Sequence, residues 1–195
     1  MTSGTLDRAA DALADGELVV YPTETVYGLG ADALAPRAVE GVFDAKRRDR
    51  DEPVSMAVHD VDAALAHVRP TARTREFMRE FLPGPVTVVC RRRETVPDAL
   101  TAGRDRVGVR VPDHELALAL LARAGPLTAT SANVSGRQSA RRVAELDPEI
   151  REAAAVVLDG GETPGGGSTV VDVAADEVIR RGHLADDVAA WLDAH

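Results

Sequence analysis

The sequence predicts an α/β fold in which helices flank a twisted sheet of mixed parallel and antiparallel strands. Short apolar runs bounded by glycine, proline or aspartate recur along the chain, as is typical of buried strands. Segments with apolar residues at helical spacing separate most of these runs, although some strands follow one another directly. The composition, 45% hydrophobic but only 3% aromatic, indicates a core of valine, leucine and alanine, which suits helices packed on a sheet.

In the N-terminal half, a helix at 5–14 carries Leu6, Ala9 and Leu13 on one face and stops at Gly16. The apolar run 18–21 predicts a buried strand that leads into a turn. Further along we expect a helix that begins at 35–37 and ends near 46, a strand at 54–58, a helix from an Asp60 cap to 68, a helix at 71–82 and a strand at 86–92.

In the C-terminal half, we expect a strand at 107–111 and an apolar helix at 115–124 that Pro112 and Asp113 cap. A weak strand at 127–130, helical segments at 139–145 and 148–154, strands at 155–158, 169–173 and 178–181, and a helix at 184–192 follow. Neither an internal repeat nor a low-complexity linker divides the 195 residues, so we expect a single domain over 1–195.

The charge balance limits what the surface can bind. With 23 basic and 32 acidic residues the net charge is -9, which argues against a surface that binds nucleic acid or membrane as a whole. Any site for a polyanion must therefore be local. The acidic, arginine-rich composition suggests a halophilic origin, and equal stability and activity in dilute buffer and molar salt would count against it.

Several function classes lack their sequence signals. The chain has neither an apolar run of transmembrane length nor a charged and apolar leader at 1–18, so we expect a soluble, cytoplasmic protein that binds no membrane. The lone Cys90 lies in an apolar run and is expected to be buried. The five histidines show no zinc-binding spacing, and we identify no metal ligands from the protein. Phosphate-loop, dinucleotide and nucleophile-elbow patterns are missing too.

Three turns that follow strands share one chemistry. They are rich in hydroxyl groups and glycine, and they contain Thr23 and Thr25 in the first, Ser131, Asn133 and Ser135 in the second, and Ser168 and Thr169 in the third. Such turns bind phosphate or carboxylate oxygens through hydroxyls and backbone N–H groups. The same residue types also form ordinary turns, so a single one would carry little weight.

Two basic groups could complete an anion site. Lys46 is the only lysine beside 22 arginines, and its compact charge suits a phosphate oxygen, although a solvated helix end would explain it as well. Arg104, Arg106 and Arg110 form a second basic group that could hold phosphates or a carboxylate, and the spacing of Arg106 and Arg110 places both on one side of a strand.

Taken together, these motifs resemble the YrdC-like family, whose better-known members are threonylcarbamoyl-AMP synthases of tRNA modification. The matching segments cover almost the whole chain in the family's order: 22–30, Lys46-x-Arg48 with Pro53, 83–87, Arg110-x-Pro112-x-His114, 131–136, 159–161 and 168–170. Their combined order and spacing are far more specific than a single motif.

The resemblance implies an α/β fold with a concave basic ligand-binding face and the conversion of L-threonine, bicarbonate and ATP, with Mg²⁺, into threonylcarbamoyl-AMP and pyrophosphate. It also implies roles for individual residues. Lys46 and Arg48 would be catalytic and hold the phosphates. The other ATP-site residues would be Glu52, Arg106, Ser131, Asn133, Arg141 and Arg180, and the threonine site would comprise Thr23, Thr25, Arg110, Ser131 and Ser168.

The chain departs from the family pattern at a few positions near this site. Asp49 stands where many relatives have proline, Glu52 where a neutral residue is common, Ala57 where some have histidine, and Gly167 where a bulkier residue is frequent. A carboxylate at 52 would repel ATP unless Mg²⁺ or an arginine intervenes. The chain ends without the second domain of some relatives, so we expect a site that closes by other means or stays open.

The resemblance also names partners and rival functions. A transferase that modifies tRNA would accept the adenylate, and the basic face could bind tRNA or double-stranded RNA directly. One rival is a paralogue similar to YciO, and another is an RNA-binding module without chemistry. Pyrophosphate release that requires threonine and bicarbonate would separate the synthase from both.

Overall fold

The structure, a computed structural model, describes residues 3–195. Its helices are α1 (Ser3–Ala14), α2 (Pro36–Lys46), α3 (Val61–Ala64), α4 (Ala72–Phe81), α5 (Asp98–Thr101), α6 (Glu115–Ala124), α7 (Pro148–Ala153) and α8 (Ala185–Ala194), with a short 3-10 helix, η1 (Val143–Glu145). Its strands are β1 (Leu18–Tyr21), β2 (Gly28–Gly30), β3 (Ser55–Ala57), β4 (Val86–Arg91), β5 (Arg106–Arg110), β6 (Leu127–Ser131), β7 (Ala154–Val157), β8 (Thr169–Asp172) and β9 (Glu177–Arg180). None of the helices in this part of the chain is long and apolar enough to span a bilayer.

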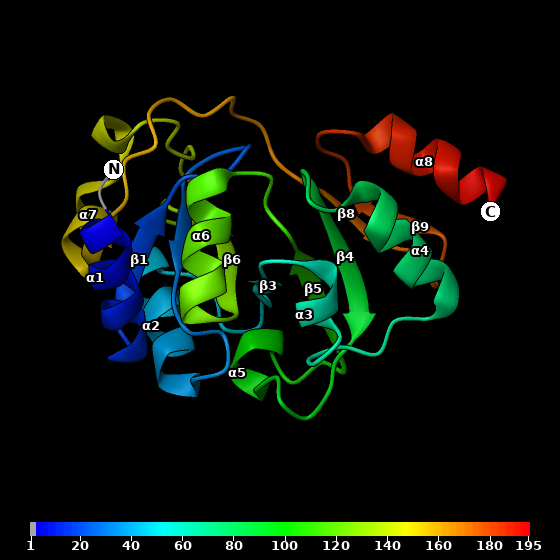
Figure 1. The fold of residues 1–195 in the computed structure, drawn as a ribbon, viewed down its shortest axis with the longest axis horizontal. Coiled ribbons are helices and arrows are strands. Elements are labelled where there is room, and N and C mark those ends of the chain that lie inside the picture. The colour runs from blue at the N-terminus through cyan, green and yellow to red at the C-terminus, as the bar shows by residue number, and fades with distance from the viewer. Residues whose placement is uncertain (1–2) are drawn as a thin grey trace.

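The nine strands of the described residues form one sheet in the order β7-β1-β2-β6-β3-β5-β4-β8-β9. The pairs β1–β7, β3–β5 and β4–β8 are parallel and the other five are antiparallel, which confirms the predicted mixed sheet. β7 lies at one edge of the sheet and β8 lies next to the opposite edge. The chain between them passes along the ends of the strands, as the orange segment above the strands in Figure 1 shows.

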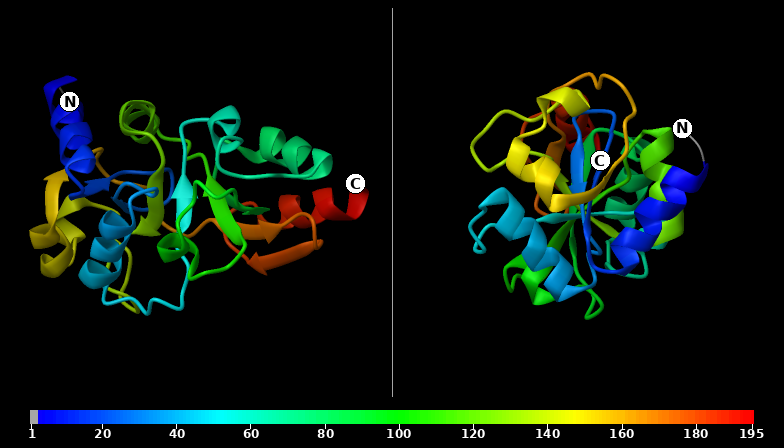
Figure 2. Two further views of the ribbon diagram at one scale, coloured as in Figure 1. Left: turned by 90° about the horizontal axis from the view of Figure 1, so that it is seen from below. Right: turned by 90° about the vertical axis from the view of Figure 1, so that its left-hand side faces the viewer.

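The β1 half of the sheet is covered by helices on both faces. Leu18 and Val20 pack in a cluster with residues of α2 and α7, whereas Val19 and Tyr21 pack in a second cluster with residues of α1 and α6. Successive side chains of a strand point to opposite faces, so a run of four buried residues supplies both layers. The right-hand view of Figure 2 shows the helices on the two sides of the strands.

The β4 half of the sheet packs a core on one face only. Alternate residues such as Met56, Val88 and Val109 lie in the largest apolar cluster. The residues between them, among them Thr87 and Gly108, line a cavity on the opposite face. The same period of two that builds the core therefore supplies the floor of the cavity.

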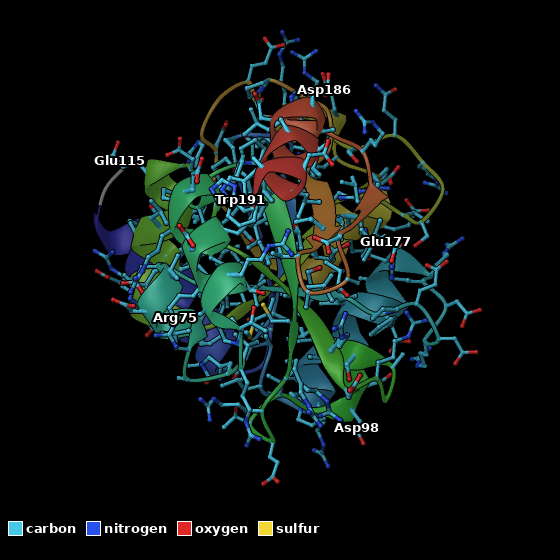
Figure 3. All side chains as sticks on the ribbon, turned by 90° about the vertical axis from the view of Figure 1, so that its right-hand side faces the viewer. Arg75, Asp98, Glu115, Glu177, Asp186 and Trp191 are labelled. Carbon is cyan, nitrogen blue, oxygen red and sulfur yellow. The ribbon has the colours of Figure 1, made fainter. Side chains whose placement is uncertain are left out.

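The C-terminal helix α8 closes the core beyond β4. The Trp191 ring packs edge-on against Phe77 of α4 at a centroid distance of 5.0 Å, and its indole N–H donates to Glu80. Figure 3 shows Trp191 on the side of α8 that faces α4, with Asp186 on the outer side. This contact joins α4 and α8 into one layer.

Two helix predictions are too long. The helix capped by Asp60 ends at Ala64, because the chain then turns to pair with β4, where Arg69 N–H donates to Arg91 C=O and Arg93 N–H donates to His67 C=O. The predicted helix at 139–145 contains only η1, since the Ala140 and Arg141 carbonyls accept from Tyr27 and Thr163 instead of from a helical turn.

The structure also differs from the predictions in the cap of one helix and in two short elements. The cap of α6 is His114, whose Nδ1 accepts from Leu116 N–H, rather than Pro112 and Asp113. The strand β2 and the helix α5 were not predicted, because three residues and one turn are too short for a periodic pattern. In β2, a side chain at Gly30 would place its Cβ 2.9 Å from the Tyr21 ring, so glycine is needed beside β1.

Candidate active site

A cavity of about 680 Å³ lies over the open face of the β4 half of the sheet. Its wall contains more basic than acidic side chains: Arg48, Arg104, Arg106, Arg110 and Arg180 against Asp105 and Asp172. The turn after β1, the ends of β5 and β6, and the turn before β8 all reach it, so the structure brings together the three hydroxyl-rich turns that the sequence predicted to share a site.

The turn after β1 holds its hydroxyls in a directed chain of hydrogen bonds. Thr23 Oγ1 donates to Val26 C=O at 2.6 Å, so the Thr25 hydroxyl, 3.0 Å away, is the donor to Thr23 Oγ1. Thr25 Oγ1 in turn accepts from Arg110 Nη2 at 2.9 Å. The two threonines therefore serve as supports for Arg110, and only Thr25 Oγ1 keeps a lone pair for a ligand.

Arg110 comes from the end of β5 and has a second partner in this turn. Its Nη2 donates to Glu24 Oε1 at 3.0 Å, and both side chains are almost buried, with exposed fractions of 10% and 14%. Both hydrogens of Nη2 are thus used inside the protein. Among the described residues, Arg110 Nε and Nη1 have no hydrogen-bond partner, so their N–H groups remain for a bound anion.

Ser168 and Arg180 form the opposite side of the cavity. Arg180 Nη2 donates to the Ser168 carbonyl and hydroxyl oxygens at 2.9 Å each, and Ser168 Oγ lies 3.1 Å from Thr87 Oγ1. Burial lowers the pKa of Arg180, and the positive charges of Arg110 and Arg48 lower it further. The positive charges of arginines from three separate segments thus act on one another, and a bound anion would offset their repulsion.

Lys46 lies beneath the turn after β6. Only 2% exposed, it does not line the cavity; its Nζ donates to the carbonyl oxygens of Ser131 at 2.5 Å and Asn133 at 2.7 Å. Burial lowers its pKa to about 8, and Arg48 contributes in the same direction. The lysine is therefore not on a solvated helix end, and its role toward phosphate stays a prediction.

Arg48 reaches the cavity because the chain reverses after α2. Arg47 has φ 49°, a left-handed conformation that ends the helix and turns the next residue toward the sheet. Arg48 then donates to the carbonyl oxygens of Glu52 and Pro53 and lies 3.4 Å from the Glu52 carboxylate. An arginine thus lies beside the Glu52 carboxylate, while Glu52 itself is exposed and outside the cavity wall.

Two other predicted ATP-site residues do not line the cavity. Asn133 is buried, and its amide donates to the carbonyls of Val134 and Arg137, so it shapes the turn. Arg141 donates to Thr163 C=O and pairs with Glu162 beside the segment between β7 and β8. Arg106 does line the cavity, in a close ion pair with the buried Asp172.

The cavity also contains residues that the sequence analysis did not single out. They include Ser55, Thr87 and Asp172, whereas Arg104, which also lines the cavity, belongs to the second basic group that the sequence indicated. The alternation of polar and apolar residues along β3 and β4 could have identified Ser55 and Thr87. Gly108 stands between them, where an added Cβ would lie 2.9 Å from Thr87 Cγ2, so any side chain there would fill the floor.

Over residues 3–195, no group of three or more histidine, cysteine, aspartate or glutamate side chains could hold a metal ion. The two aspartates of the cavity wall do not change this, since Asp172 is already paired with Arg106. The cavity residues therefore fit a cation that is coordinated mainly by oxygens of a bound ligand, and they do not fit one that protein side chains alone would coordinate.

Fold and cavity together define an α/β protein with an arginine-lined binding cavity over one face of a mixed sheet. The Sua5/YciO/YrdC family model, described as telomere recombination, matches residues 11–182. The chain therefore belongs to this family, which confirms the resemblance seen in its motifs.

The curated proteins to which the chain is similar include three threonylcarbamoyl-AMP synthases. It is 39% identical to that of Pyrococcus abyssi over 85% of this chain and 49% of the relative, and 37% identical to that of Bacillus subtilis over 88% and 50%. The chain thus spans about half the length of these two relatives. The protein of Shigella boydii serotype 4 is 36% identical over 89% of this chain and 94% of its own length.

Solved structures agree on the fold. Sua5 of Pyrococcus abyssi in complex with L-threonine superposes with a TM-score of 0.79 at 38% identity, over 86% of this chain and 50% of that one. YciO of E. coli superposes with a TM-score of 0.81 over 93% and 91%, but at 24% identity, so this likeness shows the fold alone.

Proposed function

We propose that this protein is an L-threonylcarbamoyladenylate synthase, a nucleotidyltransferase that forms threonylcarbamoyl-AMP and pyrophosphate from L-threonine, bicarbonate and ATP. The observation that carries the proposal is that one cavity gathers arginines from three segments around the hydroxyls of Thr25 and Ser168. The relatives named threonylcarbamoyl-AMP synthase support it, including one of almost the same length.

The threonine site of the proposal lies at the turn after β1. Arg110 offers its free Nε and Nη1 groups to the carboxylate, and Thr25 Oγ1 can accept one hydrogen bond from the amine or the hydroxyl of the amino acid. The L-threonine in the similar Sua5 structure supports an amino acid as the ligand of this cavity.

The nucleotide site of the proposal is formed by Arg48, Arg106 and Arg180, with the Ser131 turn above Lys46. Mg²⁺ would enter with ATP, held by the phosphate oxygens, because the cavity wall lacks a carboxylate cluster of its own. The ion would neutralise phosphate charge; the arginines would orient the triphosphate and stabilise the departing pyrophosphate.

The reaction joins two anions, so positioning and charge neutralisation dominate catalysis. The amine of threonine attacks the bicarbonate carbon and water leaves, which gives a carbamate. A carbamate oxygen then attacks the α-phosphorus of ATP, and the bond from that phosphorus to the bridging oxygen of pyrophosphate breaks. The adenylate is a mixed anhydride, so we propose that a tRNA-modifying transferase consumes it directly.

The decisive experiment is mass-spectrometric detection of threonylcarbamoyl-AMP from the purified protein. The product and an equal amount of pyrophosphate should appear only when threonine, bicarbonate and MgATP are all present. Pyrophosphate release without threonine, or no turnover under any of these conditions, would contradict the proposal. Salt-sensitive tRNA binding without turnover would instead support an RNA-binding module.

A further inference from the structure

Glu24 is the one acidic residue in the turn between β1 and β2, and it differs from its neighbours in where its side chain lies. Thr23 and Thr25 on either side line the cavity, whereas Glu24 does not. Its side chain is only 14% exposed and pairs at 3.0 Å with Arg110, which does line the cavity. Glu24 therefore contacts, from outside the cavity wall, an arginine that belongs to that wall.

The carboxylate is only half satisfied. Oε1 accepts from Arg110 Nη2 at 3.0 Å, but Oε2 is buried and has no hydrogen-bond partner within residues 3–195. The other buried side-chain atoms without a partner in this part of the chain are Arg73 Nε and Thr101 Oγ1, and neither residue lines the cavity. A buried charge with an unpaired oxygen is costly, so a fold keeps it where it serves a function.

Glu24 affects the orientation and the charge of the Arg110 guanidinium. Nη2 carries two hydrogens, and Glu24 Oε1 and Thr25 Oγ1 take one each. With Nη2 held at two points, the plane of the guanidinium is fixed, and only Nε and Nη1 can meet a ligand. The nearby carboxylate also offsets part of the arginine charge, which suits an anion of single charge better than a triphosphate.

We propose that Glu24 is a positioning residue that fixes Arg110 to receive the carboxylate of an amino acid and separates this site from the phosphate-binding arginines. The proposal rests on the proposed function for the identity of the ligand, but not for the effect on Arg110. Glu24 acts through Arg110 and does not touch the substrate itself.

The test compares Glu24→Ala and Glu24→Gln with the unchanged protein and with Glu40→Ala. Glutamine keeps an oxygen that can accept from Arg110 Nη2, whereas alanine removes both the acceptor and the charge. Glu40 is a matched control because it also pairs with an arginine, Arg50 at 2.6 Å, but on an exposed surface outside the cavity wall. Thermal unfolding of all four proteins identifies any loss of folded protein.

Two measurements are made on the folded variants. In nitrogen-15 NMR spectra, the two hydrogens on Arg110 Nη2 should give separate signals in the unchanged protein and average with each other in Glu24→Ala, because rotation about the Cζ–Nη2 bond is less restricted once Glu24 Oε1 is gone. In calorimetry, L-threonine should bind about tenfold more weakly to Glu24→Ala, less so to Glu24→Gln, and MgATP should bind as before to both.

Unchanged Arg110 signals in Glu24→Ala would overturn the positioning role, whatever the ligand is. Equal losses of threonine and MgATP affinity would also overturn it, since a general loss of structure would explain them. If Arg110 is released in Glu24→Ala but the unchanged protein binds no amino acid, the role of Glu24 stands and the proposed function fails.

Discussion

The two sides of the cavity hold their cations by different means. At the turn after β1, Arg110 is paired with the Glu24 carboxylate and the Thr25 hydroxyl. On the other side, Arg48 of the cavity wall and Lys46, which is buried outside that wall at the end of α2, are held mainly by backbone carbonyls. A carboxylate cancels much of an arginine's charge, whereas a carbonyl orients a cation and leaves its charge available.

This difference indicates how one cavity could sort two anionic substrates. A site with a partly neutralised arginine suits the single charge of an amino-acid carboxylate. A site in which most cations keep their charge suits a triphosphate. Arg180, which donates only to Ser168, belongs with this second group, and Arg106, which pairs with Asp172, is its exception. We call the surroundings of Arg110 the threonine side, and those of Lys46, Arg48 and Arg180 the phosphate side. The predictions below test this separation, from the largest expected effect to the smallest.

Replacing Lys46 should affect the phosphate side most. Lys46→Ala removes a buried charge and leaves the carbonyls of Ser131 and Asn133 without their donor. We expect adenylate formation, measured as pyrophosphate release, to fall at least about a hundredfold, the scale for loss of an electrostatic group in an active site. An unchanged rate in a variant that unfolds at the same temperature would remove Lys46 from the mechanism.

Replacing Arg110 should affect the threonine side. Arg110→Ala alone would leave Glu24 buried and unpaired, which costs roughly 3–5 kcal/mol of stability. The double variant Arg110→Met with Glu24→Gln avoids this cost and is the better test. By calorimetry, we expect threonine to bind about thirtyfold more weakly, the scale for loss of a charged hydrogen bond, and MgATP to be little affected. The reverse would assign Arg110 to the nucleotide.

The sequence predicted the frame of the site better than its interior. The bounds of β1 and α6 follow from local apolar patterns, and the motifs identified Thr25, Arg110 and Ser168, which do lie at one cavity. These bounds and the shared location could be predicted because periodicity and turn chemistry act over a few residues, whereas the roles of the three residues stay predictions.

The position of Lys46 could not be predicted in the same way. A lysine at a helix end is usually solvated, and its burial here depends on carbonyls 85 and 87 residues further along the chain. Glu24 was missed for a related reason: its partner, 86 residues away, is invisible to any local pattern. Such long-range pairings require the sheet order, which the sequence pattern did not supply.

The pKa of Lys46 predicts opposite effects of pH on binding and stability. Its ammonium, with a pKa of about 8, is charged below that pH and neutral above it, so MgATP affinity should fall up to about tenfold from pH 7 to about 9. The unfolded chain holds this proton up to its ordinary pKa of 10.5, so the contribution of Lys46 to the free energy of unfolding should rise between about 8 and 10.5.

Calorimetric titrations with MgATP and denaturant unfolding at matched pH values would measure both effects. Lys46→Met is the reference, since methionine has similar length and no proton to lose. If the unchanged protein and this variant show the same pH dependence, another group is responsible and the phosphate side does not depend on the charge of Lys46.

The smallest effect should come from Glu52, whose carboxylate lies 3.4 Å from Arg48 and is 60% exposed. If carbonyls rather than the carboxylate hold Arg48, this pair is a weak addition, since exposed ion pairs contribute about 0.2–1 kcal/mol. Glu52→Gln should therefore raise MgATP affinity about two- to threefold at low salt, leave threonine affinity unchanged, and lose its effect at high salt. A gain of a hundredfold would mean that Glu52 neutralises Arg48 as Glu24 does Arg110, and the two sides of the cavity would then follow one rule.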